Sequence, residues 1–128
     1  MEDERVRVLI VEDEPDMFLE IEDAVLANGG EVAGIATTQA EALELARFAD
    51  IALVDVHLGD GMTGPAIAKA LVNGFGIGVV FLTNHVSAVE DRDSAISVVE
   101  KPVTREAVKN AMHLAAAFKT HMGRPKSD

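Results

Sequence analysis

Short apolar runs that alternate with segments of helical periodicity constrain this chain more than any other feature. Runs rich in Val, Ile and Leu predict five strands, at residues 6–11, 31–36, 51–56, 78–82 and 96–99. Strands that alternate with helices form parallel sheets that are covered by helices on both faces. The chain is therefore expected to be an α/β protein with a doubly wound, five-stranded parallel sheet.

The segments between these runs predict the helices. Apolar residues at three- and four-residue steps place helices at about 15–28, 38–49, 65–74 and 104–118. The Thr38 hydroxyl, three residues before Glu41, predicts a capping box for the second helix, and Asn73 with Gly74 is expected to end the third. The polar, acidic segment 84–95 supports at most a shortened or irregular fourth helix. The expected buried stripe of the last helix comprises Ala107, Ala111, Met112, Leu114, Ala115 and Phe118.

Length and charge limit the classes of function. The 128 residues are expected to form one domain over 1–128, with a core at about 5–119 and a polar tail at 120–128. A net charge of −11 repels nucleic acid and anionic membranes and favours cationic partners, metal ions included. The absence of cysteine excludes disulfides and thiolate chemistry. Because the sequence has neither a signal peptide nor a membrane-spanning apolar stretch, a cytoplasmic location is expected.

Polar residues follow several of the predicted strands. Glu12 and Asp13 come after the first strand, Asp55 ends the apolar run of the third, Thr83 ends the fourth, and Lys101 follows the fifth. The carboxyl ends of parallel strands share one edge of a sheet, where ligands bind at the topological switch point. These carboxylates, hydroxyl and ammonium are therefore expected to converge on one crevice.

Such a group of residues could bind a cation and react with a phosphoryl group. Clustered carboxylates raise each other's pKa unless a cation compensates them, and all-oxygen ligands suit Mg²⁺. A magnesium ion held by Asp13, Asp55 and, less directly, Glu12 would leave one Asp55 oxygen free to attack phosphorus. Lys101 and Thr83 would then stabilise the phosphoryl oxygens. The expected product is an aspartyl phosphate.

At this point the pattern resembles the response-regulator receiver domain of two-component signalling, over nearly the whole chain. The resemblance is carried by "LIVEDEP", "LVDVHLGDGMTG", "VVFLTNH" and "VVEKPV", each at a predicted strand end. It implies a flavodoxin-like sheet of order 2-1-3-4-5 and Mg²⁺ bound by Glu12, Asp13, Asp55 and the backbone carbonyl of His57. It also implies phosphate transfer from a phosphohistidine to Asp55, and an often cis peptide bond between Lys101 and Pro102.

The sequence departs from the family at three places. Receivers usually carry Tyr or Phe where Val98 stands, and small residues where Asn84 stands. The stretch from Thr83 to Lys101 is shorter than the family norm by about one helical turn. These departures resemble the alphaproteobacterial FAT GUY subgroup, which the stretch 81–85 matches at Phe81 and Thr83.

The resulting expectation is a stand-alone receiver that takes phosphate from a histidine kinase or a phosphotransfer protein. It would signal by protein contact or serve as a phosphate sink, with no enzymatic activity beyond self-catalysed phosphotransfer and autodephosphorylation. A receiver-like module that binds partners without phosphorylation is one alternative. A haloacid-dehalogenase-type phosphohydrolase is another, although His57 stands where that chemistry needs a second acid.

Individual residues also have plainer interpretations. Asp13, Asp55 and Lys101 could form a structural ion-pair network, and Glu12 could cap the first helix or be solvated. Thr83 could serve only as a strand former. His57 and His85 either tune the lifetime of the phosphoryl group or are exposed loop histidines.

Overall fold

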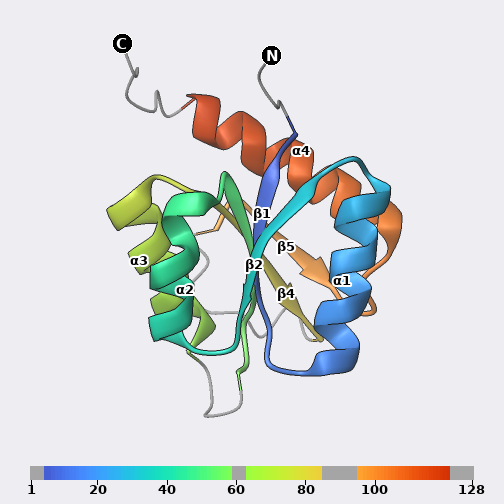
Figure 1. Ribbon diagram of the computed structural model, residues 1–128, viewed down its shortest axis with the longest axis horizontal. Helices are drawn as coiled ribbons and strands as arrows, with labels where there is room; N and C mark the ends of the chain where they lie inside the picture. The colour runs from blue at the N-terminus through green and yellow to red at the C-terminus, as the bar shows by residue number, and fades with distance from the viewer. Residues whose placement is uncertain (1–4, 59–62, 85–94, 122–128) are drawn as a thin grey trace.

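A five-stranded parallel sheet organises the protein. The computed structural model describes residues 5–58, 63–84 and 95–121. The strands are β1 (Arg7–Val11), β2 (Glu31–Ala36), β3 (Ile51–Asp55), β4 (Gly78–Thr83) and β5 (Ser97–Glu100). They lie in the order β2-β1-β3-β4-β5, and every neighbouring pair is parallel (Figure 1). The predicted fold class is confirmed, and each strand boundary lies within one residue of its predicted position.

Helices cover both faces of this sheet. The helices are α1 (Pro15–Ala27), α2 (Gln39–Leu45), the short 3-10 helix η1 (Ala46–Phe48), α3 (Gly64–Phe75) and α4 (Arg105–His121). Helices α1 and α4 pack on one face, and α2 and α3 pack on the other (Figure 1). The shortened helix predicted within 84–95 falls almost entirely on residues 85–94, outside the described part of the chain. Among the described helices, none is long and apolar enough to cross a membrane.

The core follows from the two-residue period of the strands. In β1, Val8 and Ile10 face α1 and α4, whereas Leu9 and Val11 face α2 and α3. All five residues of the central strand β3 are buried, because helices cover it from both sides. Asp55, the last of these residues, therefore ends a strand that has no solvated face.

The third helix ends later than predicted. Asn73 and Gly74 remain helical, and the helix stops only after Phe75, where Gly76 has a left-handed φ of 65°. The Gly76 amide donates to the Val72 carbonyl at 3.0 Å, which satisfies a carbonyl of the last turn. The prediction of a stop at Asn73 and Gly74 was wrong because the glycine that takes the left-handed conformation is the later one.

The second helix begins as predicted, with one difference. The Thr38 hydroxyl accepts a hydrogen bond from the Glu41 amide at 3.2 Å. The Glu41 carboxylate, however, accepts from the amide and hydroxyl of Thr37, at 2.7 and 3.0 Å. These hydrogen bonds stabilise the ionised form and lower the pKa of Glu41.

The buried face of α4 differs from the predicted stripe at Ala107, which is only half-buried, and at Leu114. Leu114 is 51% exposed, and Val108 takes its place in the core. At about 100° per residue, Leu114 lies roughly 110° around the helix from the centre of the buried face. Its side chain therefore points away from the sheet. The buried residues of α4 are Val108, Ala111, Met112 and Ala115, and the side chain of Phe118 lies outside the described part.

Candidate functional site

Asp55 lies at the carboxyl edge of the sheet, at the end of the central strand. Its neighbours are the ends of β1 and β4, which flank β3 on either side. Only 5% of the residue is exposed. One carboxylate oxygen, Oδ1, accepts a hydrogen bond from the His57 amide at 3.2 Å. The chain thus turns immediately after Asp55, and the backbone of this turn fixes the Asp55 carboxylate through the His57 amide.

Three carboxylates meet at this edge. Ligand oxygens of Glu12, Asp13 and Asp55 all lie within 4.8 Å of one another. The Glu12 side chain is fully buried, and its Oε2 accepts a hydrogen bond from the Glu14 amide at 3.2 Å. Asp13 is half-buried. The cluster can present several carboxylate oxygens to one hard cation, which is the donor set that Mg²⁺ prefers.

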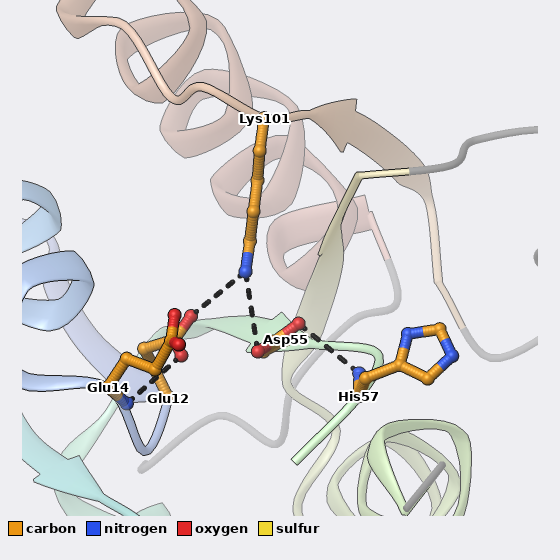
Figure 2. A network of polar contacts seen from close by, with 5 residues as sticks. All are labelled: Glu12, Glu14, Asp55, His57 and Lys101. Atoms are coloured by element: carbon orange, nitrogen blue, oxygen red, sulfur yellow. Dashed lines mark hydrogen bonds and ion pairs between the residues drawn. The ribbon is translucent and has the colours of Figure 1, made fainter. Parts of the chain in front are cut away.

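Lys101 supplies the positive charge of the site. Its Nζ lies 3.3 Å from Glu12 Oε1 and 3.4 Å from Asp55 Oδ2, and Figure 2 shows the extended side chain pointing between the two carboxylates. Its side chain is 10% exposed, so solvent screens these ion pairs little. The backbone also fixes the residue, because the Lys101 amide donates to the Thr83 carbonyl at 2.7 Å. The following bond, between Lys101 and Pro102, is cis, as the resemblance implied.

One ammonium does not compensate two buried acids. Burial and the neighbouring Asp55 charge raise the pKa of Glu12 to about 7, although Lys101 and the Glu14 amide act in the opposite direction. Near neutral pH the site without a metal therefore holds a proton on Glu12 for part of the time. A divalent cation would replace that proton, which is the behaviour expected of a metal site.

An open cavity lies over these groups. It has a volume of about 320 Å³, which gives room for a cation and a phosphoryl group. His57 is exposed at its rim, and in Figure 2 the imidazole ring points away from the Asp55 carboxylate. The lining residues are Asp13, Glu14, Asp55, His57, Leu58, Asn84 and Lys101.

Thr83 and Val98 complete the neighbourhood. Thr83 ends β4 and is 1% exposed, as expected for a hydroxyl residue beside Asp55 on the neighbouring strand. Val98 is partly buried on β5 and packs against the core shared with α2 and α3. His85, the second histidine considered from the sequence, lies outside the described residues.

Gly64 has a role that the sequence did not reveal. It begins α3 and lies directly against the chain that follows Asp55. An added Cβ would contact the Asp55 carbonyl oxygen and come within 2.7 Å of the Val56 Cα. The missing side chain lets α3 approach the site this closely. Sequence offers no signal for this, because a turn and a close approach both select glycine.

The structure thus brings Glu12, Asp13, Asp55 and Lys101 together at one edge, with Thr83 on the adjacent strand. The interpretation of Glu12 as a solvated residue was wrong, because its carboxylate is fully buried. Glu12 does bond to the amide of Glu14, the residue that precedes α1. The Glu12 carboxylate therefore bonds to the backbone that leads into α1 and also belongs to the acidic cluster.

A parallel sheet of this order, with acids after β1, an acid ending β3, a hydroxyl residue ending β4 and a lysine after β5, defines a class of protein. In its fold and in these residues the chain is similar to the receiver domains of response regulators. Within this class, several proteins to which it is similar are PhyR regulators.

The comparisons with known proteins give the extent of that similarity. No family model matches the chain. The Phyllosphere-induced regulator PhyR of Methylorubrum extorquens is 33% identical over 86 residues, which are 65% of this chain and 32% of the regulator. The solution NMR structure of the PhyR receiver domain of Erythrobacter litoralis has a TM-score of 0.80 at 28% identity and covers 97% of both chains.

A longer protein is also similar. The crystal structure of the anti-anti-sigma factor PhyR of Bartonella quintana has a TM-score of 0.76 at 26% identity, covering 94% of this chain and 51% of the other. The chain thus spans about half of that protein, and the matched segment spans a third of the Methylorubrum regulator.

Proposed function

We propose that this receiver domain accepts a phosphoryl group on Asp55, and that the donor is the phosphohistidine of a histidine kinase or a phosphotransfer protein. The observation that supports this most directly is the position of the Asp55 carboxylate. It lies under an open cavity, 3.4 Å from the Lys101 ammonium and beside two further acids. We place this reaction in the cytoplasm, as the sequence predicted.

The residues fit a magnesium ion. Glu12, Asp13 and Asp55 would hold it, together with the backbone carbonyl of His57. The ion would supply positive charge that screens the carboxylates from an incoming phosphoryl group. The raised pKa of Glu12 supports this fit, because it reflects negative charge that the chain's own lysine leaves uncompensated.

In the transfer step an oxygen of the Asp55 carboxylate attacks phosphorus. The P–O bond forms as the P–N bond of the phosphohistidine breaks, and the bonding electrons return to the imidazole nitrogen, which takes up a proton. The Lys101 ammonium balances the charge of the phosphoryl oxygens, and the Thr83 hydroxyl donates a hydrogen bond to one of them. Asp55 is placed for this role at the end of the central strand, which pairs with β1 up to Val54 and with β4 as far as Asp55 itself.

The added charge provides a signal. A phosphoryl group on Asp55 would attract Lys101 and Thr83 and shift the segments attached to them, which include β5 and α4. We propose that a protein reads this change, since the net charge of −11 disfavours nucleic acid. The Bartonella quintana relative is an anti-anti-sigma factor, which supports a partner protein of this regulatory kind.

Intact-mass spectrometry tests the central step. The protein is incubated with acetyl phosphate and Mg²⁺, and a single phosphoryl adduct is expected. The adduct should be lost in Asp55→Asn and should not form in EDTA. An unmodified wild-type protein, or an adduct that persists in Asp55→Asn, would contradict the proposal.

Val98 favours a second candidate, a receiver-like module that binds its partner without phosphorylation. The aromatic side chain that receivers usually use in switching is missing at this position. A partner complex with equal affinity for the wild type and Asp55→Asn would favour this function. The phosphohydrolase alternative predicts multiple turnovers of a phosphate ester, yet the exposed His57 ring points away from Asp55 (Figure 2).

A further inference from the structure

We propose that a second cavity, at the opposite edge of the sheet, binds small organic carboxylates with an apolar body. The cavity has a volume of about 370 Å³, which is within the usual range for small-molecule sites. Nothing in the proposed phosphotransfer uses it. The lining residues are Arg5, Val6, Asn28, Gly29, Lys109, Met112 and His113.

This cavity is separate from the site around Asp55. Arg5 and Val6 precede β1, whereas Glu12 and Asp13 follow it. The five residues of β1 span about 17 Å at roughly 3.3 Å per residue. A ligand in this cavity would therefore leave the Asp55 cavity unobstructed.

The charge of the cavity is opposite to that of the protein. The chain carries a net charge of −11, yet Arg5, Lys109 and His113 all line this one cavity. Arg5 forms an ion pair with Glu31 at 2.7 Å. Within the described part of the chain, the side chains of Lys109 and His113 form no ion pair or hydrogen bond. These two residues are four apart on α4, so they project from the same side of the helix.

The apolar part of the lining comes from Val6 and Met112. Met112 is 5% exposed, and a Cβ added at Gly30 would lie 2.6 Å from its terminal methyl carbon. Glycine at this position therefore gives the Met112 side chain its room. A thioether chain adapts to apolar ligands of different shape, which suits a site with an apolar floor.

The walls are tied together before any ligand binds. The Asn28 side-chain amide donates to the Ala24 carbonyl at 2.9 Å and to the Arg105 carbonyl at 3.1 Å, which joins the end of α1 to the first turn of α4. Gly29 then turns the chain with a φ of 85°. A preformed cavity with an apolar floor and basic side chains at its wall favours a carboxylate over a neutral or cationic molecule of the same size.

NMR titration of the whole ¹⁵N-labelled chain with hexanoate tests this inference. Saturable shifts are expected at Gly29, Lys109 and His113, without shifts at Asp13 or Asp55. Hexanamide, which is neutral and of similar shape, should bind several-fold more weakly, and hexylamine should not bind.

Variants separate charge from shape. Lys109→Met keeps the apolar stem and should weaken hexanoate binding about threefold, as expected for one partly solvated charge. Lys69→Met, on α3 at the other face of the sheet, is the matched control and should bind like the wild type. Gly30→Ala should weaken binding without a change in charge, because it displaces the Met112 methyl group.

Several results would overturn the inference. The absence of saturable shifts would remove the site, and equal affinity for hexanoate and hexanamide would show that the basic residues select nothing. An equal loss of affinity in Lys69→Met and Lys109→Met would reduce the effect to the overall charge of the protein. None of these outcomes depends on phosphorylation of Asp55.

Discussion

Replacement of Glu12 by Gln should stabilise the metal-free protein, and the gain should grow with pH. The pKa of Glu12 is raised from 4.5 to about 7, chiefly by burial and next by the charge of Asp55. Between these two values the folded protein keeps a proton that the unfolded chain has already lost. The free energy of unfolding therefore falls as pH rises through this window, and Gln, which does not ionise, removes that fall.

The size of the effect follows from the two pKa values. Integrated from about pH 5.5 to about pH 8, a group with a pKa of 4.5 in the unfolded chain and about 7 in the folded one contributes roughly 2 kcal/mol. The difference in stability between Glu12→Gln and the wild type should change by this amount in favour of the variant. Groups common to both proteins cancel in the comparison.

Urea denaturation at the two pH values, in EDTA, measures this difference. Addition of Mg²⁺ at the higher pH should then stabilise the wild type more than the variant, because the ion compensates the charge that Gln lacks. Glu31→Gln is a control for the loss of a carboxylate, because Glu31 lies outside the cluster in an exposed ion pair with Arg5. A stability difference that does not vary with pH would show that Glu12 is ionised throughout, and would refute the reasoning.

Three further predictions concern the neighbours of Asp55. Gly64→Ala should destabilise the protein by about 1–3 kcal/mol in urea denaturation, because the added methyl group clashes with the backbone after Asp55. Gly74→Ala is the control: open space surrounds Gly74, and the substitution should stabilise the protein by about 0.5–1 kcal/mol. Equal effects of the two would contradict the close approach of α3. Lys101→Met should bind Mg²⁺ more tightly in calorimetric titration, because the variant lacks the ammonium that competes for the same carboxylates. Its phosphorylation by acetyl phosphate should be slower than that of the wild type. An unchanged Mg²⁺ affinity would contradict the ion pairs. His57→Ala should shorten the lifetime of the phosphorylated protein by opening the rim of the cavity to water, and an unchanged lifetime would leave His57 a loop residue.

The three inner strands, β1, β3 and β4, were predictable because parallel strands buried on both faces are continuous apolar runs. The ends of the helices were less predictable. The sequence offers Gly74 and Gly76 as possible stops for α3, and only the packed structure decides which one becomes left-handed. Leu114 fits the three- and four-residue steps of an amphipathic helix but lies off the side that the sheet covers. Periodicity alone gives the direction of the buried face only roughly.

For the site, the sequence was sufficient to predict which residues lie together. Parallel strands bring their carboxyl ends to one edge, so Asp13, Asp55 and Lys101 could be placed together from the order of the chain. The complete burial of Glu12, and its ion pair with Lys101 at 3.3 Å, could not be placed in this way. They depend on side-chain directions after a strand has ended, where the alternation of the strand no longer applies.

Helix α1 is held at both ends by side chains outside it. At its start the Glu12 carboxylate binds the amide of Glu14, and at its end Asn28 binds the Arg105 carbonyl of α4. Its 13 residues form a rod about 20 Å long between these two attachments. Through these two hydrogen bonds α1 connects the acidic cluster to the first turn of α4, so the two regions share one rigid element.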